Sequence, residues 1–101
     1  MEFNIQNVGD ASIITINKDQ LLGVENQSFQ ILIQNSIEAG SKNIVVDLSK
    51  VKYVTSLGIE SFIHARMVCK NNSVNFALKN VNSGVRDVLS TLKLTELFGI
   101  S

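Results

Sequence analysis

The sequence predicts an α/β fold, a mixed β-sheet that carries an N-terminal antiparallel hairpin and has three helices packed on it. Two short strand-like segments at the start of the chain are separated by a Gly-Asp turn. Beyond residue 25, stripes of helical period alternate with short strand-like segments, which favours parallel pairing through right-handed crossovers. Residues 1–101 are expected to form one domain, since domains commonly contain about 50 to 250 residues.

The predicted hairpin occupies residues 3–16. An imperfect alternation of apolar residues indicates its first strand: Phe3, Ile5 and Val8. The second strand is predicted over residues 12–16, because the last four of these residues are all β-branched. The dipeptide Gly9-Asp10 between them is typical of a tight turn. A further short strand is expected before the first helix.

Three amphipathic helices are predicted, each marked by apolar residues three and four positions apart. The first begins near residue 25, stops at Gly40, and has a stripe of Phe29, Leu32, Ile33, Ser36 and Ile37. The second spans residues 56–71, with inward positions Ile59, Phe62, Ile63 and Met67. The third follows Ser83-Gly84, with a stripe of Val85, Val88, Leu89 and Leu92.

Further strands are predicted between and after these helices. Residues 44–48 form a continuous apolar run with one acid, which indicates a central strand covered on both faces. Another strand is indicated by alternating apolar positions, Val74, Phe76 and Leu78. Residues 97–100 are expected to add a last short strand. Because binding sites in such sheets gather at the carboxyl ends of strands, the junction between residues 47 and 58 is the first candidate for a functional site.

Composition argues against several functional classes. Nine basic residues balance nine acidic ones without a basic patch, so nucleic-acid binding is not expected. His64 and Cys69 are the single residues of their types, so neither a metal site nor an internal disulfide is predicted. No organic cofactor is expected either, because there is no glycine-rich phosphate loop.

Two further expectations concern catalysis and location. His64 lies about two turns beyond Ser56 on the same predicted helix, so no Ser-His-Asp arrangement arises and the chain is not expected to be an enzyme. The first residues carry neither a basic leader nor an apolar segment, and no apolar run approaches the ~20 residues of a membrane span. The chain is therefore expected to be cytoplasmic, without direct membrane insertion.

The junction itself carries a recognisable pattern. Residues 44–59 read Ile-Val-Val-Asp-Leu-Ser-Lys-Val-Lys-Tyr-Val-Thr-Ser-Leu-Gly-Ile. This stretch resembles the signature of the STAS domain, the family of anti-sigma factor antagonists. The family pattern is an apolar strand ending in Asp-Leu-Ser-x-Val, followed by x-aromatic-apolar and then Asp-Ser-Ser/Thr-Gly-Leu-Gly at a helix start. The spacing holds without a gap, and the order of elements also matches over nearly the whole chain.

The resemblance implies a phosphorylation switch at Ser56, which takes the place of the family's phosphorylatable serine. Ser56 is also predicted to be the N-cap of the second helix. The adjacent Thr55 is the second choice of acceptor, and the implied partner-binding surface consists of Thr55, Ser56, Leu57, Gly58 and Glu60. The unphosphorylated form would bind an anti-sigma factor of the serine-kinase type and so release a sigma factor. The kinase would phosphorylate Ser56, and a serine phosphatase would reverse the modification.

Three positions depart from the family pattern. Thr55 stands where the family has Asp, Leu57 replaces a second hydroxyl residue, and Glu60 replaces the second glycine. An alternative is therefore a STAS domain that does not switch and acts as an accessory or scaffold subunit of a larger complex, such as a lipid-transport or stress-sensing assembly. Homo-oligomerisation is left open by the sequence.

Overall fold

The computed structural model describes residues 3–21, 23–95 and 97–98. Along the chain its elements are β1 (Phe3–Val8), β2 (Ala11–Ile16), β3 (Gln20–Leu21), α1 (Asn26–Glu38), β4 (Asn43–Asp47), β5 (Tyr53–Val54), α2 (Ser56–Asn71), β6 (Asn75–Lys79) and α3 (Ser83–Thr91). The predicted order is confirmed up to β4 and again for α2, β6 and α3. The two-residue strand β5 was not predicted, because a segment so short carries no periodicity.

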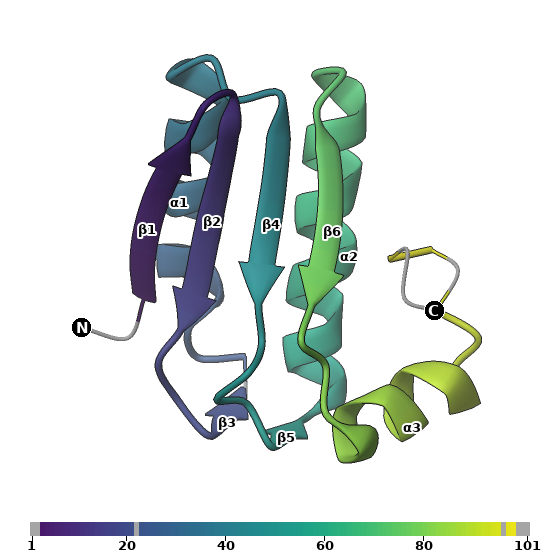
Figure 1. Ribbon diagram of the computed structural model, residues 1–101. Helices are drawn as coiled ribbons and strands as arrows, with labels where there is room; N and C mark the ends of the chain where they lie inside the picture. The colour runs from purple at the N-terminus through teal and green to yellow at the C-terminus, as the bar shows by residue number, and fades with distance from the viewer. Residues whose placement is uncertain (1–2, 22, 96, 99–101) are drawn as a thin grey trace.

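The main sheet has four strands in the order β1-β2-β4-β6 (Figure 1). The pair β1–β2 is antiparallel, whereas β2–β4 and β4–β6 are parallel. A separate two-stranded parallel sheet, β3–β5, lies beyond the carboxyl ends of β2 and β4. The predicted α/β class, with a mixed sheet, an N-terminal antiparallel hairpin and three helices, is confirmed.

The hairpin turn has the residues that the sequence predicts. Val8 pairs with Ala11, so Gly9 and Asp10 are the two loop residues. Gly9 has a φ of 60°, and Asp10 is not among the residues with positive φ. A positive φ at the first loop position alone is the pattern of a type II′ turn, which favours glycine there and matches the twist of the paired strands.

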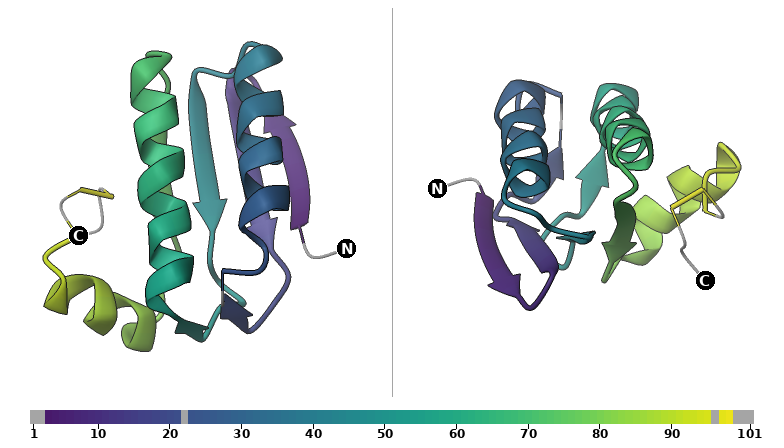
Figure 2. Two further views of the ribbon diagram at one scale, coloured as in Figure 1. Left: turned by 180° about the vertical axis from the view of Figure 1, so that it is seen from behind. Right: turned by 90° about the horizontal axis from the view of Figure 1, so that it is seen from above.

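Helices α1 and α2 lie side by side on one face of the main sheet, and α3 lies beside β5 at the end of the molecule (Figure 2). Burial in β4 alternates accordingly. Ile44 and Val46 are fully buried beneath the helices, whereas Val45 on the opposite face is half-buried. The expectation that this strand is covered on both faces was wrong, since no helix of the described chain covers the second face.

The buried face of α2 is rotated from the predicted stripe. Ile59, Phe62 and Cys69 are buried, while Ile63 is half-buried and Met67 is 58% exposed. Met67 follows Phe62 by five residues, which places it about 140° around the helix axis. The inward assignment of Met67 was therefore wrong. In α3 the same error affects one residue, because the helix ends at Thr91 and leaves the predicted stripe position Leu92 exposed.

The five phenylalanines form a continuous series through the core. Successive ring centroids are 6.0 Å apart for Phe3–Phe29, 5.7 Å for Phe29–Phe62, 6.2 Å for Phe62–Phe98 and 6.2 Å for Phe98–Phe76. The last three contacts are edge-to-face, an arrangement that aromatic rings favour. The series joins β1, both covering helices, the C-terminal segment and β6.

The predicted last strand is not formed at Leu97 and Phe98. Both residues lie in a turn, and the remaining predicted positions, Gly99 and Ile100, lie outside the described residues. Phe98 is nevertheless fully buried, and its amide donates to the carbonyl oxygen of Leu94 at 3.2 Å. Its contribution to the fold is thus a side-chain anchor.

A buried hydroxyl in α1 offers a test of the packing. Ser36 is 2% exposed, and its Oγ has no hydrogen-bond partner in the described part of the chain. An unpaired buried polar group costs about 1–3 kcal/mol of desolvation, so Ser36→Ala is expected to raise the free energy of unfolding by about 1 kcal/mol in urea denaturation.

Ser61 is the matched control, since it is also buried but donates its hydroxyl to the carbonyl oxygen of Leu57 at 3.2 Å. Ser61→Ala removes a satisfied bond and is expected to give no gain. A loss of stability in Ser36→Ala would contradict the absence of a partner for its hydroxyl.

Candidate functional site

The junction between β4 and α2 is held in place by the chain that follows β2. The carbonyl oxygen of Asp19 accepts hydrogen bonds from the amides of Lys52 at 2.8 Å and Tyr53 at 3.1 Å. Immediately beyond, β3 pairs with β5 in parallel. Because these bonds involve only backbone atoms, the start of α2 has a fixed position relative to the segment 19–21.

Thr55 is the N-cap of α2, with extended backbone angles (φ −87°, ψ 169°). Its Oγ1 accepts a hydrogen bond from the amide of Gly58 at 3.2 Å and donates to the carbonyl oxygen of Leu21 at 3.4 Å. Its own amide donates to the same carbonyl at 3.0 Å. The prediction that Ser56 caps the helix was wrong by one residue, because both hydroxyl side chains are suited to capping and spacing alone does not separate neighbours.

This assignment makes a stability prediction. Thr55→Ala is expected to lower the free energy of unfolding by about 1 kcal/mol, because the amide of Gly58 loses its acceptor. Ser56→Ala, one residue later, is expected to change it by less than about 0.5 kcal/mol. Urea denaturation of both variants measures these changes. A larger loss of unfolding free energy for Ser56→Ala than for Thr55→Ala would indicate that Ser56 is the capping residue.

Ser56 itself is the first residue of α2 and is exposed. Its hydroxyl makes no hydrogen bond within the described part of the chain. Leu57 beside it is 60% exposed and Glu60 is also exposed, whereas Thr55 is half-buried and Gly58 is buried. Three of the five residues of the predicted surface therefore face outward: Ser56, Leu57 and Glu60.

Two exposed apolar residues adjoin this region and were missed by sequence reasoning. Val24 is 81% exposed, and Tyr53 on β5 is 55% exposed. A hollow of about 240 Å³ lies at the same place, lined by Gly23, Asn26, Leu57, Glu60, Ser61 and His64. We call Val24, Tyr53, Ser56, Leu57 and Glu60 the α2 N-terminal surface. The sequence offers only a weak indication of Val24 and Tyr53, because single exposed apolar residues are common in any protein.

The loop that carries Val24 is fixed by a largely buried ion pair. Lys18 Nζ lies 2.5 Å from Glu25 Oε2, and Glu25 Oε1 accepts the amide of Gly23 at 3.1 Å. Burial alone would raise the pKa of Glu25, but the hydrogen bonds from Lys18 and Gly23 outweigh it and lower the pKa below its usual value. The carboxylate is therefore ionised at neutral pH and holds the loop. Two charges seven residues apart form no periodic pattern, so the sequence did not indicate this pair.

Asp47, the aspartate of the Asp-Leu-Ser motif, has a structural role at the end of β4. Its Oδ1 accepts the amide of Ser49 at 2.9 Å and the side-chain amide of Asn80 at 3.2 Å. Burial alone would raise the pKa of Asp47, but these bonds outweigh it and the pKa is lowered. The motif aspartate thus fixes the loops that follow β4 and β6.

Cys69 and His64 are separated by their environments as well as by their spacing. Cys69 is fully buried, and burial raises the pKa of its thiol to about 11. His64 is exposed on α2. In residues 3–21, 23–95 and 97–98, no group of three or more His, Cys, Asp or Glu side chains is placed to hold a metal ion.

Within the same ranges, no helix has both the length and the apolar character needed to cross a membrane.

The junction sequence and the fold agree with a comparison against protein families. A sequence profile described as the STAS domain matches residues 2–101. The chain belongs to the STAS domain family. A comparison of this STAS domain with curated proteins gives no match.

Solved structures share the fold. A crystal structure of a candidate anti-sigma factor antagonist from Thermotoga maritima has 24% identity and a TM-score of 0.83, covering 94% of this STAS domain and 81% of that chain. The anti-sigma factor antagonist SpoIIAA in its unphosphorylated form has 17% identity and a TM-score of 0.79, covering 93% and 83%. SpoIIAA of Bacillus in its phosphorylated form has 14% identity and a TM-score of 0.72, covering 93% and 86%.

The similarity is not confined to proteins described as antagonists. A sulfate transporter family protein from Wolinella succinogenes has 15% identity and a TM-score of 0.80, covering 93% of this STAS domain and 75% of that chain. At these identities the structural similarities establish a shared fold. What the domain binds has to be argued from its own surface.

Proposed function

We propose that this STAS domain is an anti-sigma factor antagonist. In this proposal it binds an anti-sigma factor of the serine-kinase type through the α2 N-terminal surface and is switched by phosphorylation of Ser56. The domain catalyses nothing itself, and a serine phosphatase restores the binding form. The family membership and the resemblance to anti-sigma factor antagonists support the class of partner.

One observation carries the choice of Ser56: its hydroxyl is exposed and has no structural task. Thr55 performs the capping, so phosphoryl transfer to Ser56 breaks no hydrogen bond described for the folded chain. Thr55 is a poorer acceptor, because its half-buried hydroxyl contacts both Gly58 and Leu21. Phosphate on Thr55 would disrupt the start of α2.

The same position explains how a phosphate acts on binding. At the first residue of α2, the helix dipole and the unpaired amides of the first turn stabilise an added anion. The phosphate adds about −1.5 to −2 charges next to Leu57, which is 60% exposed, and near Val24 and Tyr53. A partner that packs against these apolar side chains would have to desolvate the new charge, so binding weakens while the fold is retained.

The test combines capture with two charge variants. The tagged protein is used to capture partners from its own cells, and bound proteins and phosphopeptides are identified by mass spectrometry. We expect a serine-kinase anti-sigma factor, and a phosphate on Ser56 in the tryptic peptide that also contains Thr55. Ser56→Asp is expected to weaken the captured interaction at least about tenfold, and Ser56→Ala to retain it without the mass shift.

Ser83→Asp is the matched control. Ser83 is also the exposed first residue of a helix, α3, and is also preceded by a capping residue, Asn82, whose Oδ1 accepts the amide of Val85 at 2.9 Å. The two aspartates therefore have the same local effect on their helices. Equal binding by Ser56→Asp and Ser83→Asp, with no phosphate on Ser56, would refute the switch.

The alternative is a scaffold subunit that does not switch, and Glu60 favours it. Glu60 is exposed four residues after Ser56, hence on the same side of α2, where its charge opposes a phosphate. Capture of a multimeric or membrane-associated complex, without a kinase and without phosphate on Ser56, would support this alternative over the switch.

A further inference from the structure

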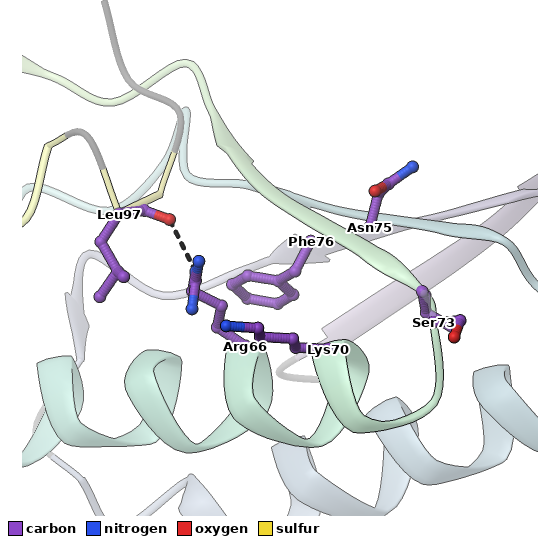
Figure 3. A pocket seen from close by; sticks show the side chains of 7 residues that line it. Arg66, Lys70, Ser73, Asn75, Phe76 and Leu97 are labelled. Atoms are coloured by element: carbon purple, nitrogen blue, oxygen red, sulfur yellow. Dashed lines mark hydrogen bonds between the residues drawn. The ribbon is translucent and has the colours of Figure 1, made fainter.

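A groove at the opposite end of α2 carries two positive charges that the proposed switch does not use. It has a volume of about 450 Å³ and lies between the second half of α2, the start of β6 and the C-terminal segment (Figure 3). Lys70 follows Ser56 by fourteen positions, which corresponds to about 21 Å along the helix. The groove is thus distinct from the α2 N-terminal surface.

Arg66 is held in the groove by one of its nitrogens. Its Nε donates to the carbonyl oxygen of Leu97 at 2.8 Å, as the dashed line in Figure 3 marks. The side chain is half-buried, and its terminal Nη groups have no hydrogen-bond partner in the described residues. One fixed nitrogen orients the planar guanidinium, while the Nη groups keep donors for a ligand.

Lys70 follows Arg66 by four residues on the same side of α2. Two like charges at this spacing are destabilising on an isolated helix. No acidic residue is among the described residues that line the groove, and the ion pair between Lys18 and Glu25 lies elsewhere. The helix dipole favours a cation in the last turn of α2, where Lys70 lies, but it does not explain the presence of Arg66 one turn earlier.

The strand β6 contributes a backbone donor and an apolar wall. The amide of Asn75 donates to the carbonyl oxygen of Lys42 at 3.0 Å, towards β4. Backbone groups alternate along a strand, so the amide of Phe76 points away from β4, at an edge where no other strand of the described chain pairs. The half-buried ring of Phe76 lies beside Arg66, whereas the side chain of Asn75 points away from it.

We propose that this groove binds a small phosphate monoester with a flat organic group. A phosphate carries close to two negative charges at neutral pH, which matches the two cations. Arg66 binds its oxygens with two parallel N–H donors, and Lys70 adds a point charge. The organic group packs on the ring of Phe76. A ligand with a single charge would leave one of the two cations without a counter-ion.

Phenyl phosphate is a suitable probe, followed by amide NMR shifts of the folded protein at constant ionic strength. We expect saturable shifts centred on Ser73, Phe76 and Leu97, and weaker binding of inorganic phosphate, which lacks the ring. Lys70→Gln is expected to weaken phenyl phosphate binding about tenfold, which corresponds to about 1.4 kcal/mol. Lys70 is exposed and makes no described hydrogen bond, so this variant should fold normally.

Lys79→Gln is the control, because Lys79 is an exposed cation on β6, the strand that borders the groove, but lies in register with Asp47 on the other face of the sheet. This variant is expected to bind phenyl phosphate like the original chain. The proposal is overturned if shifts are absent or do not saturate. It is equally overturned if Lys70→Gln and Lys79→Gln weaken binding to the same extent, since that result describes general attraction of an anion. None of these outcomes depends on Ser56.

Discussion

Replacement of Phe62 by alanine is expected to lower the free energy of unfolding by about 3–5 kcal/mol. Phe62 is fully buried in α2, and its ring contacts Phe29 on α1 and Phe98 near the C-terminus. The variant loses the buried area of the ring and leaves a cavity in the middle of the aromatic series. Since small domains are stable by about 5–15 kcal/mol, a large part of the total would be lost.

Urea and thermal denaturation measure this effect, with two controls on the same helix. Met67→Ala is expected to change the free energy of unfolding by less than about 0.5 kcal/mol, because Met67 is 58% exposed. Ile63→Ala, at a half-buried position, is expected to fall between the two variants. Similar losses for Phe62→Ala and Met67→Ala would show that the face of α2 is assigned wrongly.

Gly58→Ala is expected to destabilise the start of α2 by about 1–3 kcal/mol, the usual range for overpacking. An added Cβ would lie 2.6 Å from the carbonyl oxygen of Leu21 and 3.2 Å from Cγ1 of Val54. The same carbonyl accepts the amide of Thr55 at 3.0 Å, so moving it away would also loosen the helix cap. This loss outweighs the better helix propensity of alanine.

The control for this change is Gly84→Ala in α3. The nearest atoms to an added Cβ there are the carbonyl oxygen of Lys52 at 3.5 Å and Oδ1 of Asn82 at 3.6 Å, which are ordinary contacts. This variant is expected to gain about 0.4–1 kcal/mol, because alanine restricts the unfolded chain. Opposite signs for the two glycines in urea denaturation would support the close approach at Gly58, and equal gains would contradict it.

Much of the fold can be predicted from the periodicity of apolar residues. The predictions fail where tertiary packing determines which side chains are buried. The hairpin turn at Gly9 and the helix end at Gly40 were predictable, because glycine is the residue favoured where φ is positive. The structure has φ values of 60° and 95° at these two glycines. Periodicity could not place Met67, because Ile59, Ile63 and Met67 are four residues apart and form a helical stripe before the neighbours of α2 are known. The segment 97–98 reads as a strand, yet Phe98 contributes a buried ring from a turn.

The sequence indicates where a candidate site could lie, but it does not show which hydroxyl side chain caps the helix there. The motif predicts a site at the start of α2, and the exposure of Ser56 and Leu57 is consistent with that expectation. Which hydroxyl caps the helix depends on the backbone angles of Thr55 and on the carbonyl oxygen of Leu21, a contact between residues 34 positions apart. The Lys18–Glu25 pair likewise becomes visible only when the loop is folded.

The strand order of the main sheet has a consequence for how the protein is made. In space the strands run β1, β2, β4, β6, which is also their order in the chain. A ribosome releases the chain from its N-terminus, so each strand emerges when its partner is already available. The sheet is therefore expected to grow at one edge only, and no strand has to be inserted between two that are already paired. After the β1–β2 hairpin, each of the two later additions spans a helix, with Asn43 pairing Ala11 and Asn75 pairing Asn43, so each adds one strand together with a helix.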